Sequence, residues 1–143
     1  MSNIKFTAQT MQLMLLFEKL TRSHIKDCFE DDHGLMTIIV AQGNMQKALG
    51  PKASNVQKIK NVYKKNVRLI EFNTDVIEFI KNVARPIKLV DVRQEDNVFN
   101  MVAPDLKNRG YLIGRNAQTL RNNENIVKRY FPIQEIKVDK VNE

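Results

Sequence analysis

The chain repeats itself at a spacing of 64 residues. The segment 48–56, with the sequence ALGPKASNV, aligns with the segment 112–120, LIGRNAQTL, so that Gly50 falls on Gly114. Apolar residues recur at the same spacing in the pairs Leu13/Ile77, Leu16/Ile80, Ile25/Leu89, Ile38/Val102 and Val62/Ile126. Two copies are too few for a solenoid, in which at least three repeats must stack to bury a core. The 143 residues are therefore expected to form two small tandem domains, 1–73 and 74–143.

The boundary between the two copies has the pattern of a helix start. Asn73, Thr74 and Asp75 are residue types that cap helix N-termini, and Glu78 follows Asp75 at the spacing of a capping box. No stretch rich in glycine and serine separates the halves. We therefore expect the second domain to begin with a helix directly after the last strand of the first.

Each copy has the same order of predicted elements. In the first copy these are a helix over 11–20, strands over 23–30 and 35–42, a short helix over 44–49, a longer helix over 53–65 and a strand over 67–72. In the second copy they are a helix over 76–83 ended by Pro86, strands over 87–93 and 98–103, a short helix over 105–111, a longer helix over 117–130 and a strand over 133–138. The order α-β-β-α-α-β, twice, predicts an α+β fold whose domains each have a three-stranded mixed sheet with helices packed on one face.

The longer helix of each copy has one apolar face. At about 100° per residue, the side chains expected to be buried are Val56, Ile59, Val62 and Tyr63 in the first copy and Leu120, Ile126, Val127 and Tyr130 in the second. Asn123 interrupts the second stripe where the first copy has Ile59. The lysines and arginines of both helices are expected to point away from these stripes, toward a partner.

The positive charge is concentrated in two windows. The net charge of the whole chain is +7, but residues 43–68 alone carry +7 and residues 107–132 carry +5, so the remainder is acidic. A single lysine-rich window could be no more than a solvated helix face. Two windows at matching positions of a repeat favour a polyanionic partner, with nucleic acid first among the candidates.

A glycine stands between the two predicted helices of each copy. Glycine adopts positive φ readily and lets the backbone approach a phosphate, and the helix that follows directs its unpaired N–H groups and positive dipole end toward an anion. Leu49 and Ile113, just before Gly50 and Gly114, are expected to form an apolar floor for bases. For either copy taken alone, the alternative to a phosphate-binding loop is a glycine that only ends the preceding helix. On the phosphate interpretation, Gly114→Asp should weaken RNA binding without unfolding the chain.

These residues resemble the signature of the KH family, an apolar pair followed by G-x-x-G and then x-x-I. The sequences GPKA at 50–53 and GRNA at 114–117 stand in the loop positions, and Val56 and Leu120 close the two signatures. The element order, with a strand last, resembles the type II KH fold. A tandem of two such domains, here over residues 7–140, is similar to the archaeal NusA-like transcription factors.

The resemblance implies binding of single-stranded RNA beside each loop, in transcription termination or antitermination, with RNA polymerase as a further partner. The residues that the resemblance and the charge pattern assign to RNA are Leu49, Gly50, Pro51, Lys52, Ala53 and Lys58 in the first copy and Ile113, Gly114, Arg115, Asn116, Ala117 and Arg121 in the second. Both loops depart from the family pattern, because alanine replaces the second glycine and Pro51 removes one backbone N–H. The second loop is thus the more complete one, while the first lies in the stronger positive field.

The principal alternative is a protein-interaction module. In that case the KH loops are degenerate, and the basic faces dock on an acidic surface of RNA polymerase or the ribosome. The sparse aromatic residues argue against a base-stacking platform of another kind. Met11 and Met14 are interpreted as core residues rather than as parts of a partner groove.

Other classes of function lack their signatures. The single cysteine, Cys28, excludes a disulfide framework, and Cys28 with His24 and His33 has no metal-ligand spacing. No nucleophile triad, paired catalytic carboxylates or phosphate-binding glycine–lysine loop is present, so we expect neither an enzyme nor a small-molecule substrate or cofactor. No apolar run reaches membrane-spanning length, and no signal peptide is recognisable, which favours a cytoplasmic protein.

Overall fold

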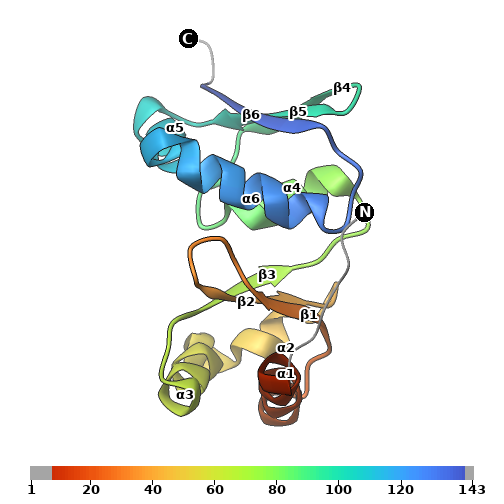
Figure 1. Ribbon diagram of the computed structural model, residues 1–143, viewed down its shortest axis with the longest axis vertical. Helices are drawn as coiled ribbons and strands as arrows, with labels where there is room; N and C mark the ends of the chain where they lie inside the picture. Colours follow the sequence, from red (N-terminus) through yellow and green to blue (C-terminus); the bar gives the residue numbers. More distant parts are fainter. Residues whose placement is uncertain (1–7, 141–143) are drawn as a thin grey trace. The chain divides into compact units, whose positions relative to one another are not determined.

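The computed structural model describes residues 8–140 and divides the chain into two compact units, one ending at Thr74 and the other beginning at Asp75. Each unit contains a three-stranded mixed sheet with helices on one of its faces (Figure 1). This confirms the predicted α+β class and the predicted order of elements. Each unit is described separately below.

The first unit follows the order α-β-β-α-α-β, with a short 3₁₀ turn between its second and third helices. Its elements are α1 (Ala8–Thr21), β1 (Ile25–Glu30), β2 (Met36–Val40), α2 (Met45–Leu49), η1 (Pro51–Ala53), α3 (Ser54–Tyr63) and β3 (Val67–Glu71). Strand β2 lies in the middle of the sheet, antiparallel to β1 and parallel to β3. The parallel pairing requires a crossover, which α2, η1 and α3 supply.

The second unit repeats this topology. Its elements are α4 (Val76–Ala84), β4 (Asp91–Glu95), β5 (Val98–Ala103), α5 (Leu106–Ile113), η2 (Arg115–Ala117), α6 (Gln118–Lys128) and β6 (Glu135–Lys140). Strand β5 is antiparallel to β4 and parallel to β6. Asp75 caps α4, because its Oδ1 accepts a hydrogen bond of 2.9 Å from the Ile77 N–H. The predicted helix start is therefore confirmed, and Glu78 forms an ion pair of 3.0 Å with Lys81.

Two strands of the second unit lie further along the chain than predicted. Strand β4 covers 91–95 instead of 87–93, because the two-residue turn at Asp96 and Asn97 fixes the hairpin register and pairs Glu95 with Val98. Residues before it are still turning away from α4, with the Ile87 N–H donating to the Ala84 carbonyl. Strand β6 covers 135–140 instead of 133–138. Turn geometry thus overrode the apolar pattern at β4, whereas β6 starts where Glu135 pairs with Val98 of β5.

The core of the first unit lies between its helices and one face of its sheet. The buried residues of this core are Leu13, Phe17, Ile25, Cys28, Met36, Ile38, Val40, Ala48, Ile59 and Val67. Burial, with a smaller contribution from the charge of Asp27, raises the pKa of Cys28 to about 12, so its thiol stays neutral at physiological pH. Met14 packs against this core as expected. Met11 does not, because it lies about 200° around α1 from Leu13 and is 51% exposed.

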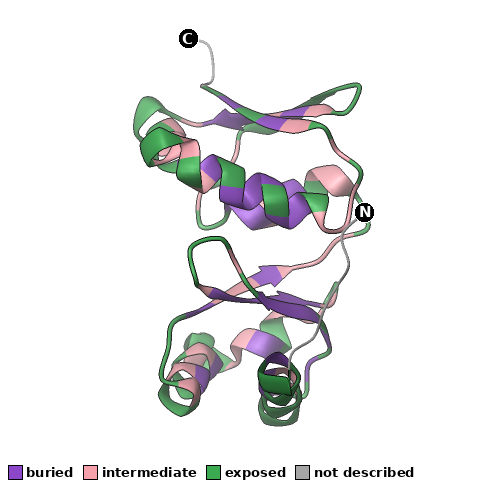
Figure 2. Ribbon diagram, in the orientation of Figure 1, coloured by how far each residue is buried: buried purple, intermediate pink, exposed green. Residues whose placement is uncertain are grey.

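The core of the second unit is built around aromatic residues. Phe79 of α4 is fully buried, with its ring centroid 5.7 Å from those of Tyr130 and Phe131, edge-on in the first case. Figure 2 shows buried residues along α4 and α6 and on the strands of the sheet. Other large side chains buried in this unit are Ile80, Phe99, Met101, Leu112, Ile126 and Ile136. Within residues 8–140, no helix is long and apolar enough to cross a membrane.

The apolar stripes of the longer helices are only partly as predicted. In α6, Leu120, Ile126 and Val127 are buried, and Asn123 is buried beside them. In α3, Ile59 is buried, but Val62 is 59% exposed. Its position, about 60° from Ile59 on the side away from Val56, places it at the edge of the stripe.

Candidate nucleic-acid interface

The two predicted clamp loops have nearly the same backbone conformation. Gly50 has φ 72° and ψ −178°, and Gly114 has φ 74° and ψ 177°. This combination is essentially restricted to glycine. Each glycine ends a helix, because the Gly50 N–H donates to the Gln46 carbonyl at 3.0 Å and the Gly114 N–H donates to the Gly110 carbonyl at 2.9 Å. The positive φ expected at both positions is therefore confirmed.

The residues that follow each glycine form a left-handed turn. Lys52 and Ala53 have φ of 54° and 56°, and Asn116 and Ala117 have φ of 54° and 60°. The turns close through hydrogen bonds from the Ala53 N–H to the Gly50 carbonyl, at 3.1 Å, and from the Ala117 N–H to the Gly114 carbonyl, at 3.3 Å. Alanine thus occupies a left-handed position at which the KH signature has its second glycine, at a cost in backbone strain.

Relieving that strain is expected to stabilise the protein. Ala53→Gly and Ala117→Gly should each raise the free energy of unfolding by about 0.5–1 kcal/mol, because glycine adopts positive φ without a Cβ penalty. Urea denaturation followed by circular dichroism measures the change. Lys58→Gly, in the regular part of α3, is the control and should lower stability by about 1 kcal/mol. A loss of stability in both alanine variants would contradict the strain argument.

Each loop glycine packs against one polar side chain five residues later. A Cβ at Gly50 would lie 2.6 Å from Nδ2 of Asn55, which donates to the Lys47 carbonyl at 3.2 Å and ties α3 to α2. A Cβ at Gly114 would overlap Oγ1 of Thr119 and lie 3.0 Å from its backbone N. Asn55 and Thr119 are themselves 64 residues apart, a signal in the repeat that sequence reasoning missed. Steric crowding thus explains why glycine stands at both positions, independently of any ligand.

The residues assigned to RNA from the sequence differ in exposure. Exposed are Pro51, Lys52, Ala53, Lys58, Arg115, Asn116 and Arg121, and half-buried are Leu49, Gly50, Ile113, Gly114 and Ala117. Each loop therefore combines a half-buried apolar residue and glycine with an exposed cation. The cations stand at different loop positions, since Lys52 corresponds to Asn116 and Arg115 corresponds to Pro51. Within residues 8–140, Lys52, Lys58 and Arg115 form no ion pair.

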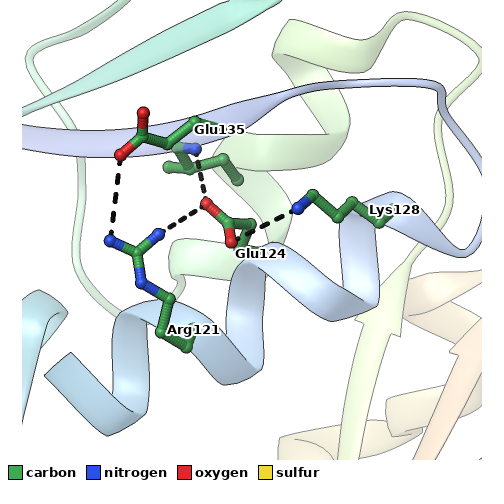
Figure 3. A network of polar contacts seen from close by, with 5 residues as sticks. Arg121, Glu124, Lys128 and Glu135 are labelled. Carbon is green, nitrogen blue, oxygen red and sulfur yellow. Dashed lines mark hydrogen bonds and ion pairs between the residues drawn. The ribbon is translucent and has the colours of Figure 1, made fainter.

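Arg121 differs from these three cations, because it belongs to an ion-pair network inside the second unit (Figure 3). Its Nη1 lies 2.8 Å from Oε2 of Glu124, and its Nη2 lies 3.8 Å from Oε2 of Glu135. Glu124 also accepts a hydrogen bond of 2.8 Å from the Ile136 N–H and lies 3.5 Å from Nζ of Lys128. Its side chain is only 7% exposed. Of the six cations in the window 107–132, Arg121 and Lys128 are therefore paired, so this window offers fewer unpaired cations than its net charge of +5 suggests.

The described part of the chain provides no alternative site for a metal ion. No group of three or more histidine, cysteine, aspartate or glutamate side chains gathers there in a way that could hold one. Cys28 is buried in the core, whereas His24 and His33 are exposed. Cys28 therefore does not share a surface site with these two histidines.

Curated relatives align with most of the chain. A probable transcription termination protein NusA from Methanocaldococcus jannaschii is 30% identical over 96% of this chain and 76% of its own. Proteins of the same name from Methanococcus vannielii and Halococcus morrhuae are 31% and 30% identical, over 94% and 86% of this chain and 79% and 89% of their own. No protein-family model matches the chain.

A solved structure supports the fold independently. The crystal structure of APE1850 superposes with a TM-score of 0.69 at 18% sequence identity, over 93% of this chain and 99% of the other. At that identity the likeness concerns the fold alone. The curated relatives establish more than the fold. Two of them are 30% and 31% identical to the chain, which covers more than two thirds of their length. The chain belongs to the family of small archaeal NusA-like proteins, as the resemblance of its two loops indicated.

Proposed function

We propose that the chain is an RNA-binding transcription factor of the termination or antitermination type, in which two type II KH domains, residues 1–73 and 74–143, bind single-stranded RNA. The names of its archaeal relatives support a role in transcription termination. The observation that carries RNA binding is the duplicated loop, in which a glycine at φ 72° or 74° precedes a left-handed turn with an exposed cation. Both loops keep this conformation although alanine, at Ala53 and Ala117, is strained in the left-handed position. This shared conformation supports a common function of the two loops.

The two loops would hold phosphates in different ways. In the first loop, the ammonium groups of Lys52 and Lys58 supply the charge. In the second, Arg115 offers a guanidinium that pairs with phosphate oxygens, and Asn116 offers an amide. Leu49 and Ile113 border the loops and would contact the bases. Arg121 would serve mainly to connect α6 with β6, because its guanidinium forms ion pairs with Glu124 and Glu135.

Charge reversal in the loops tests this proposal. Lys52→Glu and Arg115→Glu should each weaken binding of a fluorescent single-stranded RNA roughly tenfold, because a charge-assisted phosphate contact is replaced by repulsion. Fluorescence anisotropy at fixed salt measures the affinity. Lys88→Glu is the matched control, because Lys88 is exposed and lies outside both basic windows. An equal loss in all three variants, or none in the loop variants, would refute specific binding at the loops.

A second candidate function is docking on a protein such as RNA polymerase or the ribosome. The observation that favours it is the apolar surface of α1, where Met11 is 51% and Leu15 is 66% exposed. Single surface leucines are common in monomeric proteins, so this observation is the weaker one. Competition distinguishes the candidates, because excess single-stranded RNA should not displace a protein partner held by apolar contacts.

A further inference from the structure

A polar pocket lies at the C-terminal end of α3, in the first unit. Its volume is about 550 Å³, and it is lined by Gln57, Lys60, Asn61, Lys64, Lys65 and Asn66. Helix α3 has ten residues and therefore spans about 15 Å. The clamp loop precedes the first residue of this helix, whereas the pocket lies around its last turn. The two features are thus separate positions along one helix.

The pocket has the chemistry of an anion site. Its lining provides three ammonium groups and three carboxamides and no carboxylate. Within residues 8–140, none of the three lysines takes part in an ion pair. Gln57 donates to Asn61 through a hydrogen bond of 3.0 Å, which fixes the orientation of two of the amides. Ammonium groups bind phosphate oxygens, and carboxamides supply donors and acceptors for ribose and base edges.

The corresponding surface of the second unit contains ion pairs instead of unpaired lysines. At the spacing of 64 residues, Lys60 corresponds to Glu124 and Lys64 corresponds to Lys128. Glu124 lies 2.8 Å from Arg121 and 3.5 Å from Lys128, so the cations of α6 are neutralised within the unit. In α3 a lysine stands in place of that carboxylate. Lys60 and Lys64 line the same pocket with like charges, and a bound polyanion would reduce their repulsion.

We propose that this pocket is a second RNA-backbone site, which binds the part of a single strand that extends beyond the clamp loop. The inference rests on the proposed function, because it assumes that RNA occupies the loop. RNA fits the pocket better than an acidic protein does, since no apolar or aromatic side chain lines it. Protein interfaces draw most of their affinity from such side chains, and this pocket has none to offer.

A neutralised triple variant tests the inference. Lys60→Gln, Lys64→Gln and Lys65→Gln are combined, and the matched control combines Lys19→Gln, Lys88→Gln and Lys137→Gln, which are exposed lysines elsewhere. Oligouridylates of about four and about sixteen nucleotides serve as probes, because a KH loop clamps about four. The pocket variant should bind the longer probe roughly tenfold more weakly and reduce its logarithmic salt dependence by about 2. Its affinity for the shorter probe should stay within about twofold of the wild type.

Each other outcome has a distinct meaning. If the pocket variant binds the longer probe as the wild type or the control does, the second site is refuted and the loop proposal stands. An equal loss for both probes would refute a site separate from the loop. If the wild type binds neither probe, the proposed function itself fails. If the wild type binds a polyglutamate peptide of equal charge as tightly as the longer probe, and the pocket variant loses both, the ligand is an acidic protein rather than RNA.

Discussion

Gly114→Ala is expected to lower the free energy of unfolding by about 3 kcal/mol, the largest effect predicted for a single substitution in either loop. The backbone at Gly114, with φ 74° and ψ 177°, disfavours any side chain. The added Cβ would also overlap Oγ1 of Thr119 and lie 2.8 Å from its Cβ. Because the crowding includes the backbone N of Thr119, a change of side-chain rotamer does not remove it. Urea denaturation monitored by circular dichroism measures the loss.

The other copy provides the control. Gly50→Ala should cost about 2 kcal/mol, because the backbone strain is the same but only side-chain atoms of Asn55 crowd the new Cβ. In the double variant Gly50→Ala/Asn55→Ala, the total loss should be smaller than the sum of the two single losses. Equal costs for Gly50→Ala and Gly114→Ala, with additive behaviour of the double variant, would contradict this account of the loops.

The same geometry changes how RNA binding has to be tested. From sequence, Gly114→Asp was expected to weaken RNA binding without disturbing the fold. The structure contradicts the second part of this expectation, because any side chain at Gly114 is strained and crowded. Loss of RNA binding in such a variant would report a distorted loop as readily as a lost contact. Charge reversal at the exposed Lys52 and Arg115 avoids this ambiguity.

Glu124→Ala is expected to lower the free energy of unfolding by about 2–3 kcal/mol. The substitution leaves the buried N–H of Ile136 without its acceptor, which alone costs about 1–3 kcal/mol. It also removes the ion pairs with Arg121 and Lys128, but these side chains are 49% and 39% exposed, so solvent screens both pairs and their share is small. Chemical denaturation measures the change.

Glu124→Gln separates the two contributions. Glutamine keeps an oxygen for the Ile136 N–H, but it loses the charge and replaces the oxygen near Lys128 by an NH2 group, so the cost should be about 1 kcal/mol. If both substitutions destabilise the unit equally, the ion pairs rather than the backbone hydrogen bond connect α6 to β6. The first unit has Lys60 at the corresponding position, so Lys60→Ala should have little effect on stability.

Periodicity and turn chemistry were sufficient to predict the order of elements. The apolar spacing within each helix is a local property, and it located α1, α3, α4 and α6 and the buried residues Ile59, Leu120 and Ile126. The local pattern was not sufficient where strand pairing or packing against another element determines a strand's bounds or a side chain's burial. Strand β4 runs to Glu95 because its hairpin turn sets the register, and it starts only after the turn that follows α4. Met11 and Val62 are exposed because each lies at or beyond the edge of the buried face.

The sequence by itself determined that the chain contains two copies of one α+β unit, each with a glycine turn before a basic helix, because repetition, periodicity and turn residues are properties of neighbouring positions. Only the tertiary structure decided which charges remain available to a ligand. Arg121 and Lys128 are paired with Glu124, whereas Lys60, Lys64 and Lys65 surround an open pocket. Ion pairing depends on distances of a few ångströms between side chains, and a net charge summed along the chain contains no such distances.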